Sequence, residues 1–240
     1  MKTSTAIVVA IDGPGASGKS TVARAAARAL GFAYVDTGAM YRTLAWHCVR
    51  TGVDLSSPRA IAGACRRWKT RLHLVTGDPA EVVLLVDGYR PADEIRTRDV
   101  SKAASDVAVV PSVRQWMKRV QRECGAFGNL VMEGRDIATN VFPETDFKFW
   151  LDASPEERVR RRQSQGVDDN LAYRDRQDSQ RAAAPLMVGL GAVRIDTTGR
   201  PVGDIVAGIE AGVRDGLQQR SDARGGRVQE AGAASRSVSP

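Results

Sequence analysis

The chain has 240 residues, of which 42% are hydrophobic and 26% charged, a balance typical of ordinary globular proteins. This composition excludes a fibrous repeat and a wholly disordered chain, and the length allows one large domain, two small ones, or one domain with a long insertion. The formal net charge of +7 suits an anionic partner such as a nucleotide, a nucleic acid or a phospholipid surface.

Cysteine usage and hydropathy narrow these partners. Cys48, Cys65 and Cys124 are odd in number and form no CxxC spacing, which favours neither a disulfide framework nor a zinc site and indicates a reducing compartment. No apolar run approaches the roughly 18 residues of a membrane span, and basic residues are not interleaved with aromatic ones. We therefore expect a cytoplasmic protein that binds neither membranes nor nucleic acid.

Strand and helix patterns alternate along the chain. Residues 6–12 form an apolar, β-branched run typical of a parallel strand buried on both faces, and a glycine-rich turn leads to a predicted helix over 18–30 that Gly31 ends. Further strands are predicted at 32–35, 129–133, 147–151 and 193–196. Helices are predicted from residue 40 to 51, after Pro111, after Ser154 and from Val202. This order predicts a doubly wound α/β fold with a five-stranded parallel sheet flanked by helices.

Two stretches depart from the alternation. Residues 71–75 and 81–86 are strand-like runs joined by a turn that contains Gly, Asp and Pro, which predicts a hairpin insertion. Residues 218–240 contain almost no large apolar side chain and are predicted to be a disordered tail. The folded domain is therefore expected to span residues 1–217, with an insertion at about 68–98.

The turn after the first predicted strand is a phosphate-binding loop. It fits GxxxxGKS/T at every fixed position and lies between a strand and a helix, as this motif requires. Backbone N–H groups and the helix dipole of such a loop bind phosphates, Lys19 reaches the β/γ oxygens, and Ser20 can ligate Mg²⁺. The residues expected to bind ATP are Gly13, Pro14, Gly15, Ala16, Ser17, Gly18, Lys19, Ser20 and Thr21.

A phosphate loop alone does not identify the phosphoryl acceptor, since GTPases, motors and small-molecule kinases all share it. The NKxD segment that reads guanine in GTPases is missing, and motors or helicases are typically larger. A small kinase remains, and its site must hold a second anion opposite the loop.

Arginines are candidates for that second anion site. Bringing two polyanionic substrates together requires dense positive charge, and the planar guanidinium groups of Arg42, Arg135 and Arg181 suit phosphate oxygens. Arg135 directly follows a predicted strand, at the carboxyl edge where open α/β sheets bind ligands.

Three ordered segments accompany these arginines. Residues 36–42 read DTGAMYR, residues 133–143 read EGRDIATNVFP, and residues 174–186 read RDRQDSQRAAAPL. With the phosphate loop, they closely resemble the motifs of bacterial cytidylate kinases, which are P-loop nucleoside monophosphate kinases, over about residues 6–217. The hairpin insertion also sits where that family has a CMP-binding insertion. The resemblance implies ATP- and Mg²⁺-dependent phosphorylation of CMP and dCMP to CDP and dCDP by a monomeric enzyme.

The resemblance also implies roles for individual residues. Those implied for the acceptor phosphate are Thr37, Arg42 and Arg135; for cytosine, Ser105, Arg114 and Asp136; and for the sugar and phosphate, Asp178 and Arg181. Catalytic roles are expected for Lys19, Arg135, Arg161 and Arg181.

A short lid is expected over residues 158–174. Arg158, Arg161 and Arg162 follow the predicted helix start at Ser154, where the resemblance implies a lid that closes over ATP. A solvated, charged helix face is the alternative. The segment from 162 to 174 is shorter than the family usually has, Ala138 replaces a usual glycine, and Asn140 replaces a usual apolar residue. The last two changes are expected to shift the loop beyond Asp136.

Other functions share part of this pattern. A UMP, AMP or shikimate kinase would have the loop and the arginines, but not the hairpin insertion together with the GRD segment. A nucleotide-binding regulator without enzymatic activity is the remaining alternative.

Overall fold

The fold is organised around one sheet, which the computed structural model describes within residues 6–164, 175–176, 178–180 and 184–234. The sheet has seven strands in the order β3-β4-β2-β5-β1-β6-β7. Their bounds are β1 Val8–Asp12, β2 Ala33–Asp36, β3 Thr70–Val75, β4 Glu81–Val86, β5 Leu130–Gly134, β6 Phe147–Asp152 and β7 Val193–Asp196. The predicted parallel strands pair side by side as β2, β5, β1, β6 and β7.

The prediction of a five-stranded sheet is wrong, because the insertion adds two strands. β3 and β4 pair antiparallel from Thr70↔Val86 to Val75↔Glu81, which is the predicted hairpin. β4 then joins the edge of β2 in parallel through Tyr34↔Glu81. Val82, Leu84, Leu85 and Val86 are buried, so the hairpin shares the core of the domain and covers an edge that β2 would otherwise expose.

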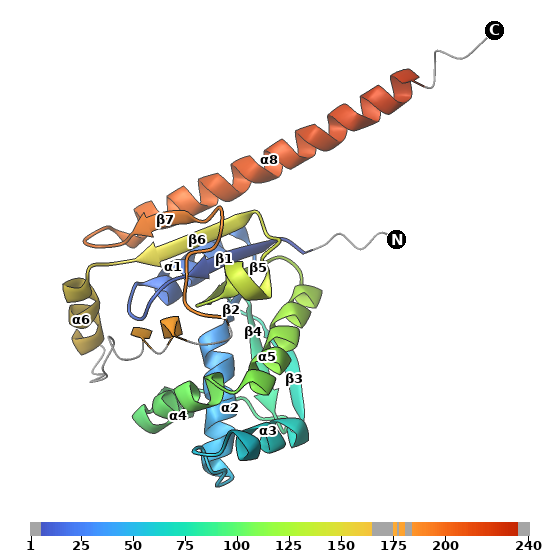
Figure 1. Cartoon of the computed structure of the whole chain (residues 1–240). Coiled ribbons are helices and arrows are strands. Elements are labelled where there is room, and N and C mark those ends of the chain that lie inside the picture. The colour runs from blue at the N-terminus through green and yellow to red at the C-terminus, as the bar shows by residue number, and fades with distance from the viewer. Residues whose placement is uncertain (1–5, 165–174, 177, 181–183, 235–240) are drawn as a thin grey trace.

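Helices cover both faces of the sheet (Figure 1). On one face, α1 and α8 pack over Val9 and Ile11, while Val8 and Ala10 point into the core beneath α2, α4 and α5 on the other. β1 is therefore buried on both faces, as its sequence predicts. The helices are α1 Lys19–Leu30, α2 Thr37–Arg50, α3 Pro58–Arg67, α4 Arg98–Ala108, α5 Pro111–Glu123, α6 Pro155–Ser164 and α8 Val202–Ala234, with short turns η1 Asp93–Arg96, η2 Cys124–Phe127 and η3 Ile137–Val141.

Side-chain caps decide where several helices begin. α2 begins at Thr37, earlier than predicted, because the Asp36 carboxylate accepts a hydrogen bond from the Ala39 N–H at 2.7 Å. Ser57 and Thr97 cap α3 and α4 in the same way, and these two helices were not predicted. At the other end of α1, Gly31 adopts the predicted left-handed conformation, with φ of 66°.

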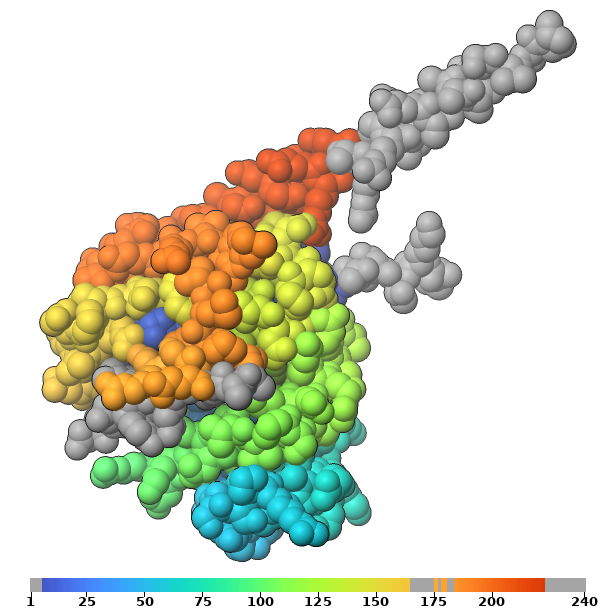
Figure 2. Space-filling model, viewed as in Figure 1, coloured from blue at the N-terminus to red at the C-terminus, as the bar shows by residue number. Residues whose placement is uncertain are grey.

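The C-terminal helix extends into the segment for which the sequence predicts a disordered tail. α8 continues through residues 218–234, and Figure 1 shows it leaving the body of the molecule. In the space-filling view of Figure 2, the coloured part of α8 lies along the top of the body. Ile205, Ile209 and Val213 are buried against the sheet, so the packed first turns nucleate the helix. Within the described residues, no helix combines the length and the apolar character needed to span a membrane.

Candidate active site

The phosphate loop connects β1 to α1 at the carboxyl edge of the sheet, as predicted. A side chain at Gly13 would place its Cβ 1.9 Å from the Leu151 carbonyl oxygen on β6, so only glycine allows this close approach. Gly18 has a left-handed φ of 88° and precedes the first turn of α1. Strand, loop and helix thus form the arrangement that binds phosphates through backbone N–H groups.

Lys19 folds back over this loop. Its buried ammonium donates hydrogen bonds to the Pro14 carbonyl oxygen at 2.5 Å and to Ser17 Oγ at 3.3 Å. Burial and the neighbouring Arg135 guanidinium both lower the pKa of Lys19. An arriving anion would reverse this effect, so the lysine is placed to stabilise negative charge at the loop.

Glu133 joins the loop to the centre of the sheet, although the sequence reasoning assigned it no role. Ser20 Oγ donates to Glu133 Oε2 at 3.0 Å, and the Tyr34 hydroxyl donates to Oε1. Burial raises the pKa of Glu133. An acid near the end of the strand beside the phosphate-loop strand is the Walker-B pattern, and this position in the sequence is a signal that could have identified Glu133.

A hydroxyl paired with a carboxylate is a donor set that fits Mg²⁺, which needs few protein oxygens because it keeps several waters. Among the described residues, no cluster of three or more His, Cys, Asp and Glu side chains could hold a metal by itself. The Ser20–Glu133 pair is therefore the candidate metal site, extending the predicted role of Ser20.

The predicted phosphate-binding arginines are held by acidic partners near the same strand ends. Arg42 donates to Asp36 Oδ2 at 3.0 Å, and Arg135 donates to Asp178 Oδ2 at 3.0 Å. Thr37 Oγ1 donates to the Glu133 carbonyl oxygen at 2.7 Å. The structure thus brings Arg135 and Asp178 together, while Arg181 lies outside the described residues.

The residues expected to read cytosine include a buried ion pair. Arg114 Nη2 donates to Asp136 Oδ2 at 2.7 Å, and both side chains are about nine-tenths buried. Arg114 Nη1 also donates to the Ala108 carbonyl oxygen at 3.3 Å, at the end of α4. Ser105 lies on the same helix, half-buried, three residues before Ala108.

The segment after Asp136 forms η3, a single π-helical turn, which Asp12 anchors. The Asp12 carboxylate accepts hydrogen bonds from the Ile137 and Ala138 N–H groups at 3.0 and 2.7 Å. Burial raises the pKa of Asp12 to about 6. The Ala138 side chain is buried against Gly189, where a Cβ would lie 2.9 Å from the alanine methyl group. A matching glycine therefore makes room for the unusual alanine.

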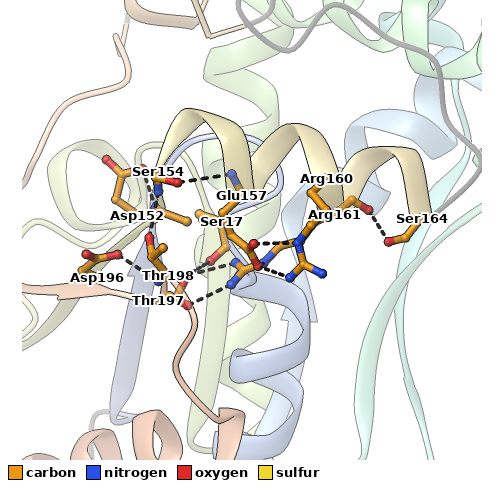
Figure 3. Close-up of polar contacts among 11 residues, drawn as sticks. Ser17, Asp152, Ser154, Glu157, Arg160, Arg161, Ser164, Asp196, Thr197 and Thr198 are labelled. Carbon is orange, nitrogen blue, oxygen red and sulfur yellow. Dashed lines mark hydrogen bonds and ion pairs between the residues drawn. The ribbon is translucent and has the colours of Figure 1, made fainter.

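Helix α6, where the predicted lid begins, is linked to the phosphate loop by hydrogen bonds (Figure 3). Ser154 Oγ accepts from the Glu157 N–H at 3.2 Å, which confirms the predicted cap. Arg161 donates to Glu157 at 2.8 Å and to both oxygens of Thr197, Oγ1 at 3.0 Å and the carbonyl at 2.8 Å. Thr197 Oγ1 in turn donates to the Ser17 carbonyl oxygen at 2.9 Å. Arg161 thus contacts Thr197, a residue of the turn after β7 to which the sequence analysis assigned no role.

Asp175 contacts both α6 and the phosphate loop. Its Oδ1 accepts from the Gly15 N–H at 3.1 Å, and its Oδ2 pairs with Arg158. A carboxylate therefore sits on one of the amides that such loops offer to phosphate. Residues 165–174, the greater part of the predicted lid, lie outside the described residues.

Comparison with known proteins agrees with this geometry. The family model described as cytidylate kinase matches residues 9–215. The chain is 42% identical to a cytidylate kinase of Pelotomaculum thermopropionicum over 88% of this chain and 97% of that protein. It is 41% identical to one of Streptomyces avermitilis, over 82% and 88%. A bifunctional pantoate ligase/cytidylate kinase of Acaryochloris marina is 40% identical over 84% of this chain and 41% of that protein.

The match spans the phosphate loop, the hairpin insertion, the Arg114–Asp136 pair and α6, which are the features described above. The chain therefore belongs to the cytidylate kinase family.

Proposed function

We propose that this protein transfers the γ-phosphoryl group of ATP directly to CMP and dCMP, giving CDP and dCDP. Membership of the cytidylate kinase family makes it a nucleotide-binding phosphotransferase. The buried Arg114–Asp136 pair is the observation that carries the choice of base, because it presents a donor and an acceptor side by side.

The donor site is the phosphate loop. Its N–H groups bind the ATP phosphates, and the Lys19 ammonium stabilises charge on the β/γ oxygens as transfer proceeds. Binding requires a phosphate oxygen to replace the Asp175 carboxylate at the Gly15 N–H. Arg158 and Arg161 would then be the lid cations nearest the nucleotide.

Mg²⁺, held by Ser20 and Glu133, would neutralise phosphate charge when bound. The chain's own contribution there is to keep the two oxygens 3.0 Å apart, with the Glu133 side chain buried and Tyr34 holding its other carboxylate oxygen.

The acceptor phosphate binds to Thr37, Arg42 and Arg135 in this proposal. Asp36 and Asp178 hold the two guanidinium groups in place before the nucleotide arrives, which lowers the entropic cost of ordering them. Asp178 and Arg181 complete the sugar and phosphate contacts. Positioning and charge neutralisation supply most of the acceleration in this reaction class, so no covalent intermediate is needed.

Cytosine is recognised at the Arg114–Asp136 pair. Its N4 amino group donates to the Asp136 carboxylate, while Arg114 donates to the N3 and O2 side, and Ser105 is assigned to the same base. Uracil carries an acceptor at position 4 and a donor at N3, so it would leave these buried groups without partners. The enzyme should therefore prefer CMP to UMP.

We also propose that the enzyme is monomeric and cytoplasmic and that it has no nucleic-acid or membrane partners. Cys48, Cys65 and Cys124 are buried thiols, and burial raises the pKa of each, which suits a reducing compartment.

One experiment tests the substrate assignment. ADP release should be measured with Mg²⁺ and ATP against CMP, dCMP, UMP, AMP and shikimate. We expect the largest kcat/KM values with CMP and dCMP. A preference for UMP, AMP or shikimate would assign a different acceptor, and ATP binding without acceptor-dependent ADP formation would indicate a regulator.

A further inference from the structure

Four side chains link α5 to the turn η3 in a ladder of two rungs. Arg114 and Lys118 are four residues apart on α5 and project from one side of it. Asp136 and Asn140 are likewise four residues apart, at the start and near the end of the turn. Arg114 donates to Asp136 Oδ2 at 2.7 Å, and Lys118 Nζ donates to Asn140 Oδ1 at 3.1 Å.

The second rung sets the orientation of the Asn140 amide. An ammonium group has only donors, so Lys118 selects the carbonyl oxygen of the amide and turns its NH₂ group the other way. That NH₂ group donates to Asp136 Oδ2 at 2.9 Å. The backbone supports the same arrangement, because the Asn140 N–H donates to the Asp136 carbonyl oxygen at 2.9 Å.

Both rungs therefore converge on a single carboxylate oxygen. Two donors on Oδ2, from α5 and from η3, fix the rotation of the Asp136 carboxylate and make Oδ1 its second, separately directed acceptor. With Arg114 alone, the carboxylate could rotate and exchange its oxygens. The amide removes that freedom.

We propose that Asn140 is a positioning residue for base selectivity and that Lys118 orients its amide. The inference rests on the proposed function, in which Asp136 accepts from the cytosine N4 amino group. Held in this way, Oδ1 accepts a hydrogen bond from the N4 amino group of cytosine but faces the O4 acceptor of uracil. The fixed carboxylate cannot rotate away from that second, unfavourable contact. The resemblance to the family leads one to expect an apolar residue at position 140, which could make neither hydrogen bond of the Asn140 side chain.

Asn140→Leu tests the proposal, because leucine has a similar size and lacks the amide. We expect kcat/KM with CMP to fall about 3- to 10-fold, the range for one lost hydrogen bond. The change should lie mainly in the KM for CMP. The CMP to UMP ratio should narrow by a similar factor, while the KM for ATP stays the same.

Two further variants separate positioning from general structural damage. In an Asp136→Asn background, Asn140→Leu should leave the CMP to UMP ratio unchanged, because the residue through which it acts has already lost its charge. Lys118→Met, at a half-buried position on α5, should narrow the ratio in the same direction by a smaller factor and provides the readout if Asn140→Leu does not fold.

An unchanged CMP to UMP ratio in folded Asn140→Leu, or an equal narrowing with and without the Asp136 carboxylate, would overturn the proposal. Failure of the proposed function would look different: the wild-type protein itself would show no CMP-dependent ADP release, or Asp136→Asn alone would leave the ratio unchanged.

Discussion

The ammonium group of Lys19 lies inside the phosphate loop with only neutral oxygens as hydrogen-bond partners. We expect Lys19→Met, which keeps most of the stem, to lower kcat by about 10³ or more because charge developing on the β/γ oxygens loses its cation. Burial already disfavours the ammonium, so the fold should survive the change. Steady-state kinetics with circular dichroism as the check on folding would test this; near-normal turnover would remove Lys19 from the reaction.

We expect Glu133 to affect the binding of Mg²⁺ and not the selectivity for the acceptor nucleotide. Glu133→Gln is nearly isosteric and can still accept from Tyr34, but it removes the charge next to Ser20. We expect the Mg²⁺ concentration for half-maximal activity to rise about 10-fold or more, the usual range for a lost metal-site partner. A Mg²⁺ titration at saturating ATP and CMP measures it. If selectivity for CMP changes and the Mg²⁺ requirement does not, the assignment to the metal is wrong.

At the scale of elements, α6 is linked to the phosphate loop through Asp175 and through Thr197, and the second link, from Arg161 to Ser17, depends on one hydroxyl group. Thr197→Val preserves volume but removes the hydrogen bonds that link Arg161 to the Ser17 carbonyl oxygen. We expect the KM for ATP to rise several-fold, since one or two hydrogen bonds hold the donor side in place, while the KM for CMP changes little.

Thr198→Val is the matched control for the link from Arg161 through Thr197 to Ser17. Thr198 neighbours Thr197, but its hydroxyl accepts from the Ser154 N–H at the start of α6, away from the phosphate loop. We expect the KM for ATP of this variant, measured by steady-state kinetics at varied ATP concentrations, to stay close to that of the wild-type protein. Equal changes in both variants would indicate a general disturbance of the segment after β7.

The elements that the sequence predicts are those determined by local chemistry. The apolar run of β1, the glycines of the phosphate loop and Gly31 each specify their own conformation. The pairing of β4 with β2 depends on residues far apart in the chain, and neither strand's pattern contains it. The roles of Arg114 and Asp136 are predicted only through resemblance to the family. The hydrogen bonds from Asp12 to η3 could not be predicted, because they join residues more than a hundred positions apart and leave no local pattern in the sequence.

At the scale of the whole molecule, the described side chains of the C-terminal helix pack against the body as far as Arg220. Leu217 packs against the core, and Arg220 pairs with Asp146 and lies over the Phe147 ring. The family match ends at residue 215. We therefore expect a chain that stops after Asp222 to keep its kcat/KM with CMP and ATP and to melt within about 2 °C of the full chain, since less than about 0.5 kcal/mol is at stake.

Thermal unfolding and kinetics of the shortened chain would test this expectation. A chain that stops after Gly212 provides the contrast, because it loses the buried Val213 and should be clearly destabilised. If the chain that ends at Asp222 loses activity, residues 223–240 contribute to function in a way that the packing of the body does not explain.

The contact between Ala138 and Gly189 also constrains the order in which this sequence could have evolved. Two β-carbons cannot coexist at 2.9 Å, well inside ordinary van der Waals separation. If an ancestor carried the glycine usual at position 138, position 189 had to lack a side chain before the methyl group could be accepted. Once the alanine was in place, any later side chain at 189 became costly. The alanine at position 138 therefore restricts position 189 to glycine, and residue 138 must return to glycine before residue 189 is free to vary.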